Sequence, residues 1–216
     1  MRVAAAASVL ALVLALALTL PLAAQERPKI VALGDSLTSG HRLPADQAYP
    51  ALLQEELDDA KLSFTVVNHG VSGDTTAGGV RRLDKALAEN PQILIVELGA
   101  NDGLRGVPVA QVRANLETII VAAQKQGVAV LLCAMDALPV NGWQYTLDFH
   151  NLYFELADRY KVPLVPFLLA GLLGNRQLMS DDGVHPNKDG AKVLAKGIWP
   201  YLRPLAEATA TRPGTR

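Results

Sequence analysis

The chain has 216 residues, the length of one ordinary domain, and is 50% hydrophobic and 19% charged, a composition that argues against intrinsic disorder. Its formal net charge of −1 offers no basic excess to a phosphate backbone, so we expect no nucleic-acid partner. The single cysteine, Cys133, excludes an intrachain disulfide framework and a zinc site with several cysteine ligands. Because Cys133 stands in an apolar run, we expect it to be a buried thiol of a strand.

Residues 1–24 have the pattern of a secretory signal peptide. A positive start at Arg2 precedes a long Ala/Leu/Val stretch, and Pro21 and small residues follow. This pattern predicts cleavage between Ala24 and Gln25 and a periplasmic or secreted protein with no stable membrane span after cleavage. An uncleaved signal anchor is the alternative, because the apolar stretch is nearly long enough to cross a bilayer. Both alternatives place the folded domain outside the cytoplasm.

Strand-like and helix-like segments alternate from residue 29 onwards. Short apolar runs typical of buried strands occupy 30–33, 64–67, 93–98, 128–135 and 162–165. Segments with helical spacing of apolar residues occupy 49–59, 75–89, 109–126, 146–160 and 188–202. This alternation predicts an α/β fold, a single-domain, three-layer α/β/α sandwich around a parallel sheet of about five strands. We expect the domain to span 25–203 and the small, polar segment 204–216 to be a flexible tail.

Two of the loops that follow predicted strands carry the residues of a nucleophile and its base. Functional sites of open α/β sheets gather at the carboxyl ends of the strands. Ser36 follows the first strand-like run, and Asp182 precedes His185 by three residues in the last loop. A local turn can bring this carboxylate to one imidazole nitrogen, which leaves the other nitrogen free to take a proton from the serine. The alternatives are a helix-capping serine and a surface loop stabilised by side-chain hydrogen bonds.

Two further loops predict donors for an oxyanion. The loop around Gly73 opens a helical segment, so its backbone amides would face the site, and glycine permits a close approach. Asn101 follows the third strand-like run and offers a side-chain amide. Alternatively, Gly73 is an ordinary turn glycine and Asn101 a left-handed turn residue. His41, His69 and His150 lack a comparable carboxylate spacing, and we interpret them as surface or structurally satisfied histidines.

Together these segments resemble the SGNH (GDSL) hydrolase superfamily. Its four blocks match Ser36 in Gly-Asp-Ser-Leu, then Gly73, then Asn101 in Gly-x-Asn-Asp, then Asp182 and His185 in Asp-x-x-His. Within the superfamily the sequence is most similar to the thioesterase I/lysophospholipase L1/arylesterase group. The supporting stretches are LGDSLTSG at 33–40, GVSGDTTAGG at 70–79, ELGANDGLRG at 97–106 and DGVHPNKDGAKVLA at 182–195. The resemblance covers about residues 29–202 and implies a flavodoxin-like sheet.

The resemblance also implies a role for each of these positions. Ser36 would be the nucleophile, His185 the general base and then the acid, and Asp182 the residue that orients His185. The Ser36 and Gly73 amides and the Asn101 side chain would hold the oxyanion. No metal or organic cofactor is expected.

The same resemblance points to a substrate-binding region. It implies that the loop 102–108 moves over the substrate, and its glycines would permit such motion. Core packing is the alternative for the apolar members of the predicted substrate-binding set, which consists of Asp102, Gly103, Leu104, Met135 and Leu138.

We therefore expect a secreted serine esterase that hydrolyses aryl esters, acyl thioesters or lysophospholipids through an acyl-enzyme on Ser36. Its partner would be a small-molecule or lipid-like ester. A carbohydrate O-acetylesterase of the same superfamily and a catalytically silent binding protein are the alternatives. The sequence has no G-x-S-x-G elbow, no dinucleotide or P-loop fingerprint and no H-E-x-x-H motif.

Overall fold

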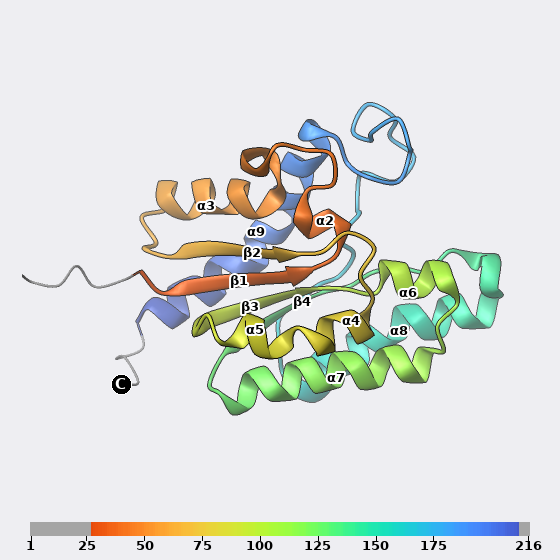
Figure 1. The fold of residues 1–216 in the computed structure, drawn as a ribbon, viewed down its shortest axis with the longest axis horizontal. Helices are drawn as coiled ribbons and strands as arrows, with labels where there is room; N and C mark the ends of the chain where they lie inside the picture. Colours follow the sequence, from red (N-terminus) through yellow and green to blue (C-terminus); the bar gives the residue numbers. More distant parts are fainter. Residues whose placement is uncertain (1–26, 212–216) are drawn as a thin grey trace, which may run out of the picture.

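Five parallel strands form one central sheet in the computed structural model, which describes residues 27–211 (Figure 1). The signal peptide expected at 1–24 lies outside the described residues. The strands follow the order β2-β1-β3-β4-β5, so the direction of winding reverses at β1 and β3. This is the flavodoxin-like order, and it confirms the predicted parallel sheet. The strand bounds are β1 Lys29–Gly34, β2 Thr65–Gly70, β3 Pro91–Glu97, β4 Ala129–Cys133 and β5 Leu164–Val165.

Burial explains the sequence of each strand. The central strands β1, β3 and β4 have helices on both faces, and nearly all their side chains are buried. Cys133 ends β4 and is fully buried, as expected. The edge strand β2 is only partly covered and accordingly mixes apolar residues with Thr65, Asn68 and His69.

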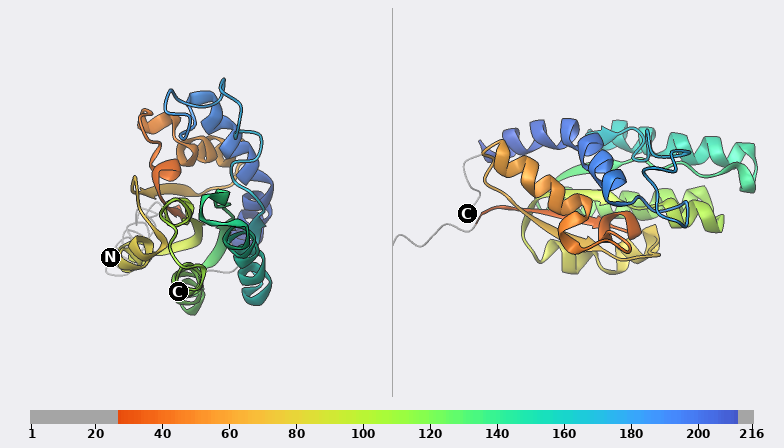
Figure 2. Two further views of the ribbon diagram at one scale, coloured as in Figure 1. Left: turned by 90° about the vertical axis from the view of Figure 1, so that its right-hand side faces the viewer. Right: turned by 90° about the horizontal axis from the view of Figure 1, so that it is seen from above.

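Helices cover both faces of this sheet (Figures 1 and 2). On one face α3 (Tyr49–Asp59) packs against α9 (Lys188–Ala210). On the other face α7 (Val109–Lys125) packs against α8 (Trp143–Tyr160) and against the shorter α4 (Thr76–Arg81). The three-layer α/β/α arrangement predicted from the alternating segments is thus confirmed.

The helix predicted at 75–89 is divided in two at Arg82. Helix α4 ends at Arg81, and α5 (Leu83–Leu87) begins after a residue with φ of −109° and ψ of 9°. Arg82 leaves helical geometry because its guanidinium turns toward the sheet, where Nε bonds Asp74 Oδ2 at 2.6 Å and Nη2 bonds the Gly34 carbonyl at 2.8 Å. These bonds connect the segment before α4 to the end of β1.

Helix α9 is longer than the sequence predicts. Residues 204–210 are helical, so the expected flexible tail does not begin at residue 204. An interior proline costs a helix roughly 3 kcal/mol, and α9 contains two, Pro200 and Pro204. The helix continues because Leu202 and Ala206 are fully buried one turn apart and Thr209 is nearly so, which keeps this face on the domain.

The loops that follow the strands meet at one end of the sheet, on the right in Figure 1. Two contain short helices, α2 (Ser36–Ser39) after β1 and α6 (Ala100–Arg105) after β3. Short 3₁₀ turns occupy Ala45–Gln47 and Pro139–Asn141. Among the helices of residues 27–211, none combines the length and apolar character needed to cross a membrane.

Ala206 and Ala208 provide a matched test of the helical C-terminus. Ala206→Asp places a carboxylate in a fully buried position, so the free energy of unfolding should fall by about 3 kcal/mol or more. Ala208→Asp changes an exposed position and should cost less than about 1 kcal/mol. Urea unfolding followed by circular dichroism measures both. Equal, small effects would show that 204–210 do not pack against the domain.

Candidate active site

Ser36, His185 and Asp182 lie in one continuous hydrogen-bonded row. His185 Nε2 is 2.9 Å from Ser36 Oγ, and His185 Nδ1 is 2.9 Å from Asp182 Oδ2. An ionised carboxylate can only accept, so Nδ1 carries the imidazole proton and donates to Asp182. Nε2 of the neutral ring is then the acceptor for the Ser36 hydroxyl. The structure therefore brings together the three residues that the sequence predicts as a nucleophile, its base and the orienting carboxylate.

The charge on Asp182 is stabilised by its own turn. Its Oδ1 accepts the backbone N–H groups of Val184 and His185, each at 2.9 Å. The His185 amide contributes most, followed by the His185 side chain and the Val184 amide, and together they hold the pKa of Asp182 well below its usual range. Asp182 is thus a carboxylate at neutral pH and keeps the His185 ring in one tautomer.

An isolated antiparallel bridge between Met179 and Pro186 holds this turn next to the start of α9. Ser180 N donates to the His185 carbonyl at 2.7 Å, and Asn187 N donates to the Leu178 carbonyl at 3.0 Å. The Asn187 side chain caps α9 through the amides of Asp189 and Gly190. Its own amide group donates back to the carbonyls of the loop. The position of His185 therefore depends on where α9 begins.

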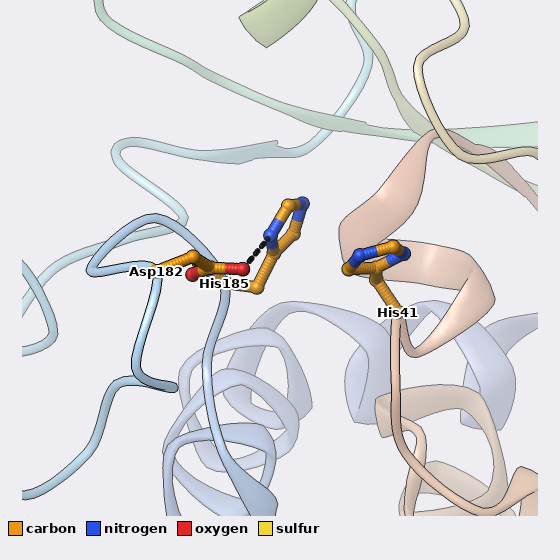
Figure 3. Close-up of side chains that lie close together, drawn as sticks. All are labelled: His41, Asp182 and His185. Atoms are coloured by element: carbon orange, nitrogen blue, oxygen red, sulfur yellow. Dashed lines mark hydrogen bonds and ion pairs between the residues drawn. The ribbon is translucent and has the colours of Figure 1, made fainter.

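Beside His185 lies a second imidazole that the sequence analysis did not select. The rings of His41 and His185 have centroids 4.4 Å apart and planes tilted by 42° (Figure 3). His41 Nδ1 is 3.4 Å from Ser72 Oγ, and the neighbouring Arg42 reaches to 3.8 Å from Asp182 Oδ2. His69 and His150 instead lie beside the carboxylates of Glu89 and Asp136, which agrees with their interpretation as structurally satisfied histidines.

His41, Asp182 and His185 are also the group in residues 27–211 whose donor atoms could approach a metal ion, all lying within 4.8 Å of one another. Both nitrogens of His185 are already engaged, one by Ser36 and one by Asp182. A metal bound to that ring would have to break one of these bonds. The arrangement consequently suits proton transfer better than metal ligation.

The predicted oxyanion donors come from the two loops beside Ser36. Asn101, on α6, donates its Nδ2 to Asp35 Oδ2 at 3.0 Å, so its amide is joined to the residue before Ser36. Gly73 has φ of +80°, a left-handed conformation that favours glycine, and its carbonyl accepts Arg105 Nη2 at 2.9 Å. The turn before α4 is in this way held to α6. Their action on an oxyanion remains a prediction.

A fully buried carboxyl group lies below the Ser36 turn. Glu97, the last residue of β3, accepts the Asp35 amide at 3.2 Å and the Thr38 hydroxyl at 2.7 Å, both at Oε2. Thr38 Oγ1 is also 2.8 Å from the hydroxyl of Tyr49 on α3. Only glycine fits at position 34, because a Cβ there would lie 1.9 Å from Thr38 Oγ1 and 2.6 Å from Glu97 Oε2.

Burial and a neighbouring charge decide which carboxyl group of this layer is ionised. Burial raises the pKa of Glu97 well above its usual value, and the negative charge of Asp35 raises it further. Burial also raises the pKa of Asp35, but hydrogen bonds from the Leu37 amide and Asn101 act in the opposite direction. Burial and charge therefore favour the neutral acid more strongly at Glu97 than at Asp35. The sequence signal for it was a lone glutamate inside the apolar run 93–98, which our sequence analysis did not use.

The predicted substrate-binding residues divide into buried and exposed ones. Asp102 is 1% exposed and accepts both the amide and the hydroxyl of Thr76, at 2.8 and 2.7 Å. Its carboxylate therefore joins α6 to α4 and has no face open to a substrate, contrary to expectation. Gly103 and Met135 are likewise buried, with Met135 in the core. Leu104 and Leu138 are 57% and 53% exposed and remain available for substrate contact.

The 102–108 segment is held at several points. Besides the Asp102 bonds to Thr76, Asn141 Nδ2 donates to the Gly103 carbonyl at 2.9 Å, and the Tyr145 hydroxyl donates to the Val107 carbonyl at 2.8 Å. Any motion over a substrate would have to break these bonds to the 3₁₀ turn Pro139–Asn141 and to α8, and such motion stays a prediction.

The chain is similar to curated proteins over most of its length. It is 40% identical over 177 residues to "Esterase TesA" of Pseudomonas aeruginosa and 36% identical over 180 residues to "Arylesterase" of Vibrio mimicus. It is 38% identical over 178 residues to "Thioesterase 1/protease 1/lysophospholipase L1" of Escherichia coli. These alignments cover 82–83% of this chain and 84–90% of the relatives. The crystal structure of TesA matches with a TM-score of 0.78 and 39% identity, covering 82% of this chain and 99% of that chain.

An open parallel sheet that carries these residues at the carboxyl ends of its strands defines an SGNH-type ester hydrolase. The sequence pattern of the GDSL-like Lipase/Acylhydrolase family matches residues 32–193, and the chain belongs to that family. Together with the esterase, arylesterase and thioesterase relatives, this membership makes the protein a carboxylic ester hydrolase.

Adjacent carboxylates offer a matched test of the hydrogen-bonded row. Asp182→Asn removes the acceptor that orients His185 and should lower kcat for an aryl ester by about 10²–10⁴. Asp181→Asn changes an exposed neighbour that makes none of these bonds and should leave kcat close to the wild-type value. Steady-state hydrolysis of p-nitrophenyl butyrate compares the two. A similar loss in both variants would contradict a specific role for Asp182.

Proposed function

We propose that this ester hydrolase is a secreted serine esterase that cleaves carboxylic esters and thioesters through an acyl-enzyme on Ser36. The observation that carries the proposal is the unbroken path from Ser36 Oγ through His185 to Asp182, with both links at 2.9 Å. A general base must lie within hydrogen-bond reach of the proton it abstracts, and His185 Nε2 meets this condition for the serine hydroxyl.

Acylation begins when Ser36 Oγ attacks the substrate carbonyl carbon as its proton passes to His185 Nε2. The imidazolium that forms is stabilised by the Asp182 carboxylate at Nδ1. When the tetrahedral intermediate collapses, the bond to the leaving alcohol or thiol breaks, and His185 returns the proton to the leaving atom. The acyl group then remains on Ser36 as an ester.

Deacylation repeats the same proton path with water. His185 Nε2 takes a proton from the water that attacks the acyl carbon, and it returns that proton to Ser36 Oγ as the carboxylic acid leaves. The protein ends the cycle unchanged, and no cofactor takes part in either step.

Three donors would stabilise the negative oxygen of both tetrahedral intermediates. They are the Ser36 amide at the start of α2, the Gly73 amide and the second hydrogen of Asn101 Nδ2, whose first hydrogen bonds Asp35. Removal of one such donor typically costs about 10²–10³ in rate. Of the three donors, Asn101 is the one to test by mutagenesis, because a substitution can remove its side-chain amide but not a backbone amide.

The relatives and the site surface support ester substrates with an apolar part. The relatives' names include esterase, arylesterase, thioesterase and lysophospholipase. Leu104 on α6 and Leu138 before the following 3₁₀ turn are both more than half exposed and offer apolar contact area. We therefore propose aryl esters, acyl thioesters and lysophospholipids as the substrate class.

Ser36→Ala tests the proposed nucleophile. The variant should lose at least about 10³-fold in kcat on p-nitrophenyl esters, because the proposed acyl-enzyme forms on the Ser36 hydroxyl. The wild type, but not the variant, should gain the mass of one phosphonyl group from a fluorophosphonate probe. Hydrolysis confined to acetyl esters would favour the O-acetylesterase alternative, and unchanged turnover in Ser36→Ala would overturn the proposal.

Secretion is the second part of the proposal, supported by the pattern of residues 1–24. Expression of the full chain in a Gram-negative host should yield a periplasmic protein. Amino-terminal sequencing of that protein should begin at Gln25. A membrane-bound product that starts at Met1 would instead establish the uncleaved anchor.

A further inference from the structure

Glu97 touches neither a substrate nor the Ser36–His185–Asp182 row, yet its carboxyl group lies where the nucleophile turn meets the sheet. We propose that Glu97 is a positioning residue of this esterase, whose buried carboxyl group fixes the nucleophile turn and, through Asp35, the side-chain amide of Asn101. The inference rests on the serine-esterase function proposed above and deepens it.

The first support is that Glu97 forms hydrogen bonds with residues on both sides of Ser36. Its Oε2 accepts the backbone amide of Asp35, just before Ser36, and the hydroxyl of Thr38, two residues after it. One oxygen atom therefore fastens both sides of the nucleophile. Because Glu97 ends β3 and pairs with Gly34 at the end of β1, this oxygen belongs to the rigid sheet and not to a loop.

The second support is the connection onward to the predicted oxyanion donor. Asp35 uses Oδ1 to accept the Leu37 amide at 3.0 Å and Oδ2 to accept Asn101 Nδ2 at 3.0 Å. One hydrogen of the Asn101 amide therefore bonds Asp35. Because the amide group is planar, this bond also fixes the direction in which the other hydrogen points. A shift of Asp35 changes where that second hydrogen points.

The third support is the state of the Glu97 carboxyl group. Its Oε1 is the one buried side-chain nitrogen or oxygen within residues 27–211 that has no hydrogen-bond partner. The titratable groups that interact electrostatically with Glu97 carry no positive charge, namely Asp35 after β1, Tyr49 on α3, Cys133 on β4 and Tyr153 on α8. The nearby Arg82 is paired with Asp74.

A negative charge on Glu97 would consequently be buried without compensation, which proteins avoid. The neutral acid keeps Oε2 as the acceptor of both bonds and leaves Asp35 as the single anion of the pair, fixed by Leu37 and Asn101. Asp35 can orient Asn101 only as long as Glu97 does not compete as a second anion beside it.

This arrangement predicts a loss in kcat rather than in KM. The oxyanion develops only in the transition state, so a misdirected Asn101 weakens that state and not substrate binding. Glu97→Met keeps the length and apolar volume of the side chain but removes the acceptor. Glu97→Gln keeps an acceptor and has no charge to lose.

The experiment is a double-mutant cycle between Glu97 and Asn101, with each activity expressed per Ser36 titrated by a fluorophosphonate. Glu97→Met should lower kcat by about 10–10²-fold with little change in KM, and Glu97→Gln should recover most of that loss. In an Asn101→Ala background, Glu97→Met should cost several-fold less than in the wild type, because the part of the loss that runs through Asn101 is already gone and only the part from the nucleophile turn remains. Equal losses in both backgrounds, or a lower melting temperature with unchanged kcat per titrated site, would overturn the inference.

A pH profile keeps the inference testable if Glu97→Met does not fold. Ionisation of Glu97 as the pH rises should reduce wild-type kcat, because the new charge repels Asp35, whereas Glu97→Gln should hold its plateau to higher pH. Superimposable alkaline limbs would contradict the inference. Ser36→Ala is assayed in the same series to separate the two proposals. Turnover that survives this substitution would refute the proposed esterase mechanism but would not by itself refute the positioning role of Glu97.

Discussion

The hydrogen bond between His185 Nε2 and Ser36 Oγ joins two residues that are 149 positions apart in the sequence. The order of the strands and helices brings these two residues together. Ser36 stands at the carboxyl end of a central strand, and His185 stands just before the last helix. Parallel strands carry every such end to the same edge. Helix α9 then packs along one face of the sheet, so its capped start delivers His185 to the serine.

Below that contact the otherwise apolar core contains a small layer of buried polar side chains. Glu97, Asp35 and Thr38 are each fully buried directly under the Ser36 turn. A buried polar layer is stabilising only when its members satisfy one another, and it then specifies a single geometry. Here the requirement is nearly met, with the single orphan oxygen on Glu97. The precision of the Ser36 turn therefore depends on groups that no substrate reaches, consistent with the wider rule that reactive residues need rigid support.

The residues that the sequence analysis identified and those it missed differ in kind. Ser36, Asp182 and His185 were recognisable because their order, spacing and place after strands are local properties of the chain. Asp102 was misassigned because its exposure is a tertiary property, since α6 turns that carboxylate inward to the amide of Thr76. His41 was missed for the same reason, as nothing in its neighbourhood along the chain shows that its ring lies beside that of His185.

By itself the sequence determined the alternation of strands and helices, the parallel sheet, the family and the row from Ser36 to Asp182, because periodicity and motif spacing are written in consecutive residues. Only the tertiary structure decided the break at Arg82, the continuation of α9 through Pro204, the burial of Asp102 and the position of Glu97 under the Ser36 turn. Each of these depends on contacts between segments far apart in the chain. At these positions burial and long-range hydrogen bonds outweigh the local secondary-structure propensity of the sequence. Such contacts cannot be predicted from patterns of consecutive residues.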